Sequence, residues 1–183
     1  ALAVSGGLEV VPVINRLQPY FDLIVATQDW HPENHGSHAV NHPERHPGEI
    51  IELAGLPQVL WPAHCIQGTE GADFVPALCR DTWDAVFQKG TDPLTDSYSG
   101  FYDNGKRQDT GLYDYLTRKN TTEVYIVGLA TDYCVKFTAL HAVELGFETS
   151  LILDACRGVN LNPGDVEQAL REMQSAGVKI IQA

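Results

Sequence analysis

Five short runs rich in Val, Ile, Leu and aromatic residues stand out from the more polar chain around them. Most of these runs are continuously apolar rather than alternating, which is typical of strands buried on both faces of a parallel sheet. The pattern therefore predicts strands over residues 23–26, 85–87, 124–128, 150–153 and 178–181.

Helical patterns lie beside these runs. Apolar residues at helical spacing predict one helix over residues 8–17. Cap and stop residues predict three more: one from Asp109 or Thr110 to 116, one from Thr131 or Asp132 to 144, and one over 166–175 opened by Asn162 and Pro163. Because strands and helices alternate through the second half, the expected fold class is α/β: a three-layer α/β/α domain with a mainly parallel sheet, spanning residues 1–183.

Composition narrows the functional classes. The 183 residues are 44% hydrophobic and 20% charged, which is ordinary for a globular protein. The net charge of -12 opposes binding to nucleic acid or to an anionic membrane surface. No apolar run approaches the roughly 18 residues of a membrane span. The four cysteines form no C-x-x-C pair, so we expect reduced thiols and a cytoplasmic protein whose partner is a small molecule.

Two long segments do not fit the alternating pattern. Residues 30–48 contain three prolines and five of the seven histidines, and residues 88–108 are rich in Gly, Asp, Ser and Tyr. Loops of about 20 residues are rare in compact domains unless they build a site. Both segments follow a predicted strand, and ligands of open α/β sheets bind at the carboxyl ends of strands. We therefore expect the site there.

The first of these segments begins with a candidate metal-binding pair. In extended backbone, Asp29 and His31 point the same way and can offer an oxygen and a nitrogen to one ion. His64 is the best candidate for a third ligand. The alternative is a solvated surface segment with several histidines, because the prolines and the glycine forbid one continuous helix there.

Cys134 is the candidate nucleophile. It follows the predicted strand 124–128 where the chain turns into a helix, and free backbone N–H groups at a helix start favour a thiolate. Lys89 ends another strand at the same edge and could stabilise that thiolate. Taken singly, Cys134 could be a buried structural cysteine and Lys89 a solvated cap. Cys156 also follows a strand but lacks a comparable helix start.

Four segments together resemble nicotinamidases, the metal-dependent branch of the isochorismatase-like cysteine hydrolases. They are TQDWHPENHGSHA, WPAHCIQGTEGADF, FQKGTDPLTDSYSGF and VGLATDYCVKFTAL, and they span residues 27–140 in the family's order. The resemblance implies a six-stranded, mainly parallel sheet and the hydrolysis of nicotinamide to nicotinate and ammonia through a cysteine thioester. Pyrazinamide is often a second substrate in such enzymes.

The resemblance also implies roles for individual residues of this chain. It implies one divalent metal ion, with zinc expected and iron or manganese also suited, and it leaves a homo-oligomer open. The implied set is Cys134 as nucleophile, Lys89 as its catalytic lysine, Asp29, His31 and His64 as metal ligands with His35 as a further ligand in some relatives, Trp61 and Tyr98 as aromatic pocket walls, and the N–H groups of Ala130 and Cys134 as oxyanion hole beside a cis Leu129–Ala130 peptide.

One family residue has no counterpart between residues 1 and 183. The family's general acid/base is an aspartate in a motif like D-x-Q-N-D-F at the end of the first strand, which we expect upstream of Ala1. Asp96 and Asp132 lie in matching segments but do not occupy that position. The alternatives are another cysteine amidohydrolase of the superfamily, or a non-catalytic binding protein if the aspartate is truly lost.

Overall fold

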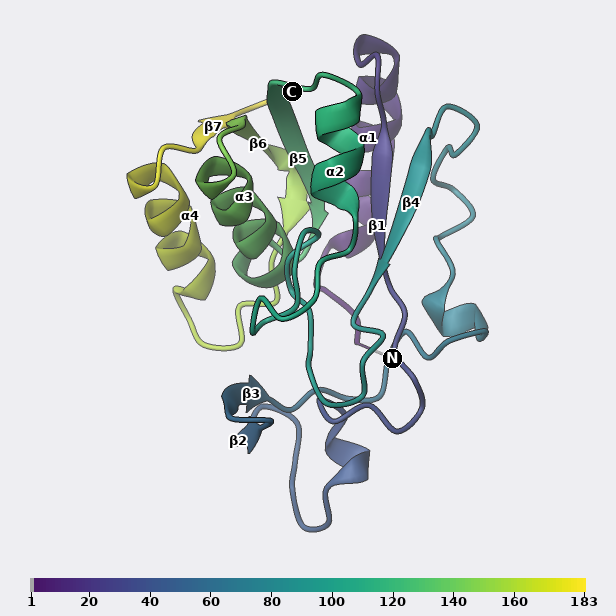
Figure 1. The fold of residues 1–183 in the computed structure, drawn as a ribbon, viewed down its shortest axis with the longest axis vertical. Coiled ribbons are helices and arrows are strands. Elements are labelled where there is room, and N and C mark those ends of the chain that lie inside the picture. Colours follow the sequence, from purple (N-terminus) through teal and green to yellow (C-terminus); the bar gives the residue numbers. More distant parts are fainter. Residues whose placement is uncertain (1) are drawn as a thin grey trace.

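Parallel strands form two of the three sheets in the computed structural model, which describes residues 2–183 (Figure 1). β1 (Val25–Asp29) pairs with β4 (Ala85–Lys89). β6 (Glu148–Arg157) lies between β5 (Glu123–Leu129) and β7 (Lys179–Ile181) and is parallel to both. Each of the five predicted strands overlaps one of these, so the strand predictions are confirmed.

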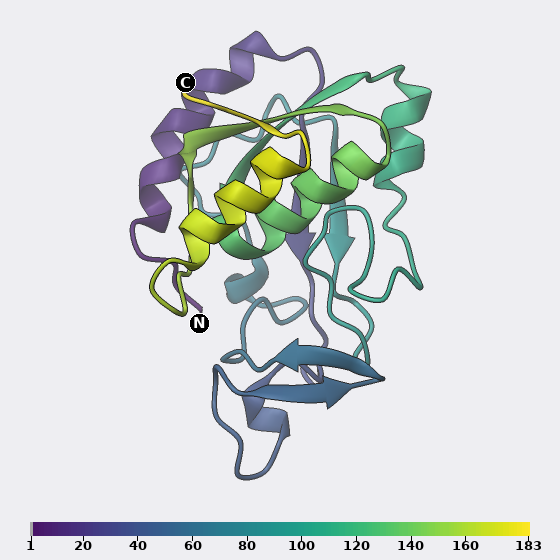
Figure 2. The ribbon, with the colours of Figure 1, turned by 90° about the vertical axis from the view of Figure 1, so that its left-hand side faces the viewer.

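Helices cover both faces of the β5–β6–β7 sheet. Helix α1 (Val10–Leu17) packs on β5 and β6 from one side, and α3 (Lys136–Glu144) and α4 (Asp165–Ser175) lie on the other (Figure 2). An apolar core fills the space between α3, α4 and β6; its buried members are Val135, Ala139, Leu151, Cys156, Met173 and Val178. The three-layer α/β/α class is therefore confirmed.

A second apolar core connects the two parallel sheets, which share no hydrogen-bonded strand pair within residues 2–183. Leu112 and Leu116 of α2 (Leu112–Arg118) pack with Phe101 and Phe147. Side chains from β1, β4 and β5 complete this core: Val25, Phe87, Val124 and Ile126. The packing holds the carboxyl ends of β1, β4 and β5 near one another.

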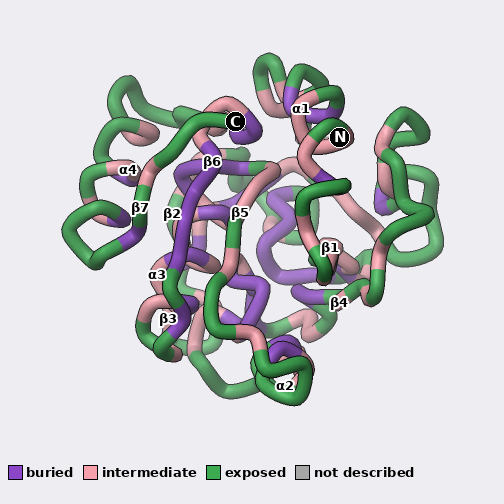
Figure 3. The backbone as a smooth tube through the Cα atoms, turned by 90° about the horizontal axis from the view of Figure 1, so that it is seen from above, coloured by how far each residue is buried: buried purple, intermediate pink, exposed green. Residues whose placement is uncertain are grey.

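The structure corrects three details of the predictions. β6 is mostly buried (Figure 3), but Val86 on β4 and Leu129, the last residue of β5, are 44% and 41% exposed, so these two strands are not continuously buried. Helix α4 begins at Asp165 with Gly164 as its N-cap residue rather than Asn162, and the Asn162 N–H donates to the Asp165 carboxylate. Gly111 is the N-cap residue of helix α2, and the Thr110 hydroxyl, one of the two predicted caps, accepts the Leu112 N–H at 3.2 Å.

A β-hairpin that the sequence analysis missed lies between the two long loops. β2 (Ile50–Leu53) and β3 (Leu56–Val59) are antiparallel and joined by Ala54 and Gly55, both with positive φ, as a tight hairpin turn requires. The chain leaves β3 directly into Trp61 and His64, so the hairpin helps to place these residues.

None of the helices within residues 2–183 has the length and the apolar character that a membrane span requires.

Candidate active site

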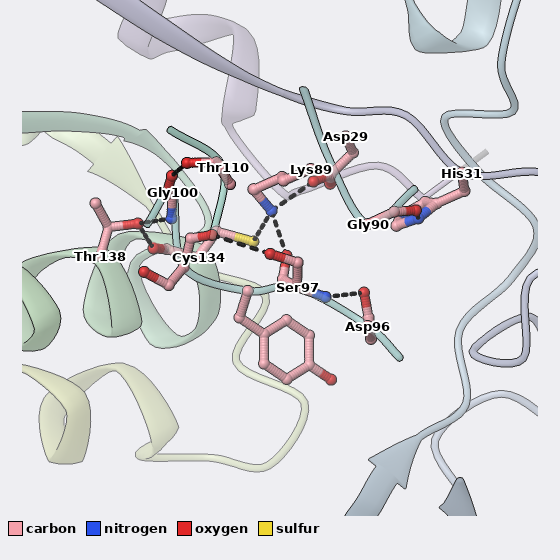
Figure 4. A network of polar contacts seen from close by, with 12 residues as sticks. Asp29, His31, Lys89, Gly90, Asp96, Ser97, Gly100, Thr110, Cys134 and Thr138 are labelled. Carbon is pink, nitrogen blue, oxygen red and sulfur yellow. Dashed lines mark hydrogen bonds and ion pairs between the residues drawn. The ribbon is translucent and has the colours of Figure 1, made fainter. Parts of the chain in front are cut away.

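Asp29 and Lys89 meet at the carboxyl ends of β1 and β4. They are the last residues of these two strands and are partners in the parallel register, so their side chains leave the same edge of the sheet. Lys89 Nζ donates to Asp29 Oδ1 at 2.5 Å, to the Ser97 carbonyl at 2.6 Å and to Cys134 Sγ at 3.5 Å (Figure 4). These three contacts use all three protons of the ammonium group.

Cys134 lies in a π-helical turn, Thr131–Val135, that joins β5 to α3. Thr138 fixes the backbone here, because its hydroxyl donates to the Cys134 carbonyl at 2.6 Å and accepts the Gly100 N–H at 2.9 Å. Burial raises the pKa of the Cys134 thiol to about 11, although the charge of Lys89 opposes the shift. Burial thus opposes ionisation of this thiol, a factor that the sequence expectation of a favoured thiolate did not include.

The Asp29–Lys89 pair is ionised. Burial alone would raise the pKa of Asp29, but the charge of Lys89 and the neighbouring His31 hold it below its usual value. Burial would likewise lower the pKa of Lys89, yet the Asp29 carboxylate raises it well above the ordinary lysine value. Lys89 therefore acts as a permanent cation beside the sulfur at neutral pH.

Asp29, His31 and His64 form a group with the composition of a metal site. One ligand atom from each lies within 4.8 Å of the others. The Nδ1 atoms of His31 and His64 each donate to a carbonyl at 2.8 Å, those of Gly90 and Pro62. Because a carbonyl only accepts, the Nδ1 proton is used in this bond, and Nε2 is the atom of each ring that can offer a lone pair to a metal ion. The residues present therefore fit a divalent ion.

His35 and His38 lie against His31 and are fully buried, each 0% exposed. The alternative of a solvated histidine segment is therefore wrong for these residues, although it holds for the exposed His46. One ligand atom each of His31, His35 and Asp96 also lies within 4.8 Å of the others. Burial, with the neighbouring imidazoles, lowers the pKa of both His35 and His38 to about 4, so both rings are neutral at pH 7.

The tautomer of His35 differs from that of His31 and His64. The backbone N–H of Ser37 donates to His35 Nδ1 at 3.2 Å, so the lone pair is on Nδ1 and the proton of the neutral ring is on Nε2. That Nε2 is buried and has no partner within the described chain. In this arrangement His35 offers a hydrogen-bond donor rather than a metal-binding lone pair.

Four aromatic side chains pack together around the segment that carries Cys134. Trp61 Nε1 donates to the Tyr98 hydroxyl at 3.2 Å, so the two predicted pocket walls lie together. Tyr133 contacts Trp61 edge-on at 4.8 Å between ring centres, and Phe137 stacks on Tyr98 at 5.5 Å. Ala130 is buried at the start of the turn, and the Leu129–Ala130 peptide is cis, as the resemblance implies.

The sequence analysis missed Gln58 and the contacts of Asp132, which both order this site. Gln58 on β3 donates to Asp96 Oδ2 at 2.9 Å and to the Tyr98 hydroxyl at 3.2 Å. Asp132 accepts the N–H groups of Val159 and Asn160 at 2.9 and 2.6 Å and so ties the turn of Cys134 to the loop after β6. The sequence indicates Asp132 only as a possible cap of the helix that follows.

Gly90 orients His31, and its substitution should weaken metal binding. Gly90 has φ +64°, its carbonyl accepts the His31 Nδ1–H, and a Cβ on it would overlap the His31 ring. For Gly90→Ala we expect a zinc affinity about 10- to 100-fold lower, as for other losses of ligand orientation. The matched control is Gly55→Ala, which has φ +82° but open space around a Cβ. Equal zinc affinity of the two variants, measured by competition with a chelator, would contradict this role.

Comparison with known proteins agrees with this geometry. The sequence matches the isochorismatase domain over residues 9–183. The nicotinamidase of Escherichia coli K12 is 49% identical, over 98% of this chain and 86% of the relative. The solved structure of an Acinetobacter baumanii nicotinamidase and pyrazinamidase superposes with a TM-score of 0.96 at 48% identity, covering 99% of this chain and 87% of that one.

A third relative is a pyrazinamidase of Pyrococcus horikoshii solved in complex with zinc. It is 39% identical, with a TM-score of 0.78, over 100% of this chain and 90% of that chain. The domain match covers nearly all of the sequence, and the Escherichia coli and Acinetobacter relatives are both named as nicotinamidases. The chain belongs to the isochorismatase family, and within it to the nicotinamidases.

Proposed function

We propose that this protein is a metal-dependent cysteine amidohydrolase that converts nicotinamide and water to nicotinate and ammonia. The observation that carries the proposal is the continuous set of contacts from Cys134 through Lys89 to Asp29, which joins the thiol to a three-ligand metal group. The names of the relatives support the choice of nicotinamide, and pyrazinamide, a similar flat amide with ring nitrogens, is the proposed second substrate.

Asp29, His31 and His64 are the proposed ligands of one divalent ion. Two neutral imidazoles and a carboxylate suit zinc, and they also accept iron or manganese. Zinc is proposed because the Pyrococcus relative was solved with it. When bound, the ion supplies a positively charged anchor for the ring nitrogen of the substrate. His35, with its proton on Nε2, is proposed as a hydrogen-bond donor to the bound ligands rather than as a metal ligand.

The chemistry at the amide belongs to the thiol and its neighbours. Cys134 Sγ attacks the amide carbon, a C–S bond forms, and the oxygen becomes negatively charged beside the N–H groups of Ala130 and Cys134. The thiol proton must leave the sulfur, and the nitrogen must gain protons before ammonia departs. Water then hydrolyses the thioester to nicotinate. The family's aspartate has no counterpart in residues 1–183, and we assign its role to no described residue.

The surroundings of the thiol favour a flat aromatic substrate. Trp61, Tyr98 and Tyr133 form adjoining aromatic surfaces, and such surfaces stack on pyridine rings. Four free cysteines within the described chain support the proposed cytoplasmic location, where thiols stay reduced.

Ammonia release tests the proposed function. Zinc-loaded protein is incubated with nicotinamide, and ammonia and nicotinate are measured together. Benzamide is the matched comparison, since it has the same amide but no ring nitrogen to meet the ion. We expect equal amounts of both products from nicotinamide and a much lower rate with benzamide. Binding of nicotinamide without either product would contradict the proposal.

Single substitutions separate the metal ligands from their neighbours. We expect His64→Ala to lose zinc on dialysis, because only two of three protein ligands remain. His35→Gln should keep one equivalent, because His35 Nε2 carries a proton in the folded protein. Elemental analysis after dialysis measures both. Loss of zinc from His35→Gln to the same extent as from His64→Ala would show that His35 is a ligand.

A further inference from the structure

Asp29 takes part in both halves of the proposed site. Its Oδ1 accepts from Lys89 Nζ at 2.5 Å, and Lys89 in turn contacts the sulfur of Cys134. One of its oxygens also belongs to the group formed with His31 and His64. Its Oδ2 makes no hydrogen bond within residues 2–183, so a carboxylate held by Lys89 still has an oxygen for an ion.

Lys89 has no free ammonium proton with which to form another hydrogen bond if its interaction with Asp29 changes. Its side chain is only 4% exposed, and its protons go to Asp29, to Ser97 and to Cys134. The charge of Lys89 favours the ionised sulfur, whereas the charge of Asp29 opposes it. The reactivity of the thiol therefore depends on how much of the negative charge of Asp29 is neutralised by other groups.

We propose that a divalent ion bound at Asp29 makes Cys134 a stronger nucleophile before any substrate enters, because the ion neutralises the same carboxylate that pairs with Lys89. The metal site then does more than anchor the substrate ring: it sets the reactivity of the thiol through Asp29 and Lys89. Among the described residues, the charges of Asp96 and Cys65 also act on this thiol or on Lys89. This inference rests on the metal group of the proposed function but not on the identity of the substrate.

The expected effect is moderate and has a definite sign. A nearby positive charge stabilises a thiolate, by about one pKa unit or more at short range, and so increases the thiolate fraction about tenfold. Each thiolate becomes somewhat less nucleophilic as its pKa falls, which cancels about half of the gain on a logarithmic scale. Loading with zinc should therefore increase the rate of alkylation at Cys134 by roughly threefold to tenfold.

Alkylation without substrate tests the proposal. Protein stripped with a chelator and protein reloaded with one equivalent of zinc are treated with iodoacetamide at one neutral pH. The peptide that contains Cys134 is followed by mass spectrometry, and the exposed Cys79 serves as the internal reference. Faster alkylation of Cys134 in the zinc-loaded protein, with Cys79 unchanged, supports the coupling. An equal or slower rate at Cys134 overturns it, and this comparison needs no variant.

Two variants show whether the ion acts from the proposed position. His64→Ala keeps the Asp29–Lys89 pair but loses a ligand, so added zinc should no longer accelerate alkylation. His46→Ala removes an exposed histidine outside the site and should behave as the unchanged protein. Their unfolding transitions are compared to confirm that both fold. Full acceleration by zinc in His64→Ala would overturn the proposal.

The outcome is independent of turnover. If zinc accelerates alkylation while nicotinamide is not hydrolysed, the coupling is supported and the proposed substrate is wrong. If nicotinamide is hydrolysed while zinc leaves alkylation unchanged, the coupling is overturned and the proposed function stands. The two failures are therefore distinguishable.

Discussion

Replacement of Cys134 by alanine is expected to abolish the release of ammonia from nicotinamide. The thiol is the only group in the proposed reaction that forms a covalent bond to the substrate, and removal of such a nucleophile lowers kcat by about 10⁴-fold or more. Metal content and fold should be unchanged, because Cys134 is not one of the proposed metal ligands. The measurement is steady-state ammonia release by the zinc-loaded variant.

The matched control is Cys79→Ala, which removes an exposed thiol remote from these contacts. It should retain the activity of the unchanged protein. Undiminished turnover by Cys134→Ala would show that the reaction does not use this thiol.

Removal of the charge of Lys89 is expected to lower both the rate of ammonia release and the free energy of unfolding. Lys89→Met leaves the Asp29 carboxylate without its ion-pair partner in a largely buried position. Loss of one partner of a buried ion pair lowers the free energy of unfolding by about 3 to 5 kcal/mol. Because the Asp29 side chain is 26% exposed, we expect a decrease of about 2 to 3 kcal/mol here. The activity should fall about 10³-fold, since the sulfur loses its neighbouring cation. Denaturant unfolding and ammonia release measure the two effects.

The double variant Asp29→Asn with Lys89→Met is the control for the stability effect. Because it removes both charges, it should be more stable than Lys89→Met alone. A double variant that is less stable by the sum of the two single effects would indicate that the pair contributes nothing as a pair.

Local sequence patterns predicted the strands and the residues at their ends. Asp29 and Lys89 were placed because each follows a short apolar run, and the parallel register of β1 and β4 brings the two together. The histidines after Asp29 were harder to assign. Prolines excluded a helix there, but only the folded loop shows that His31, His35 and His38 are buried against one another.

Long-range contacts were beyond these patterns. Gln58 reaches Asp96 across 38 residues from a hairpin whose pattern was not recognised. Asp132 binds backbone N–H groups 27 and 28 residues away. The partial burial of Cys134, which raises the pKa of its thiol, was also not predicted, although the helix start was visible in the sequence. Local propensity gives the position of a side chain, and tertiary packing determines its environment.

The mass of the Cys134 peptide during turnover tests covalent catalysis by this thiol. Zinc-loaded protein is mixed with excess nicotinamide, quenched with acid within the first turnovers, and digested for mass spectrometry. We expect a nicotinoyl group on the peptide that contains Cys134, absent from the three other cysteines, and lost when turnover is allowed to finish. Steady production of nicotinate with no acyl group on Cys134 at any time would contradict the thioester mechanism.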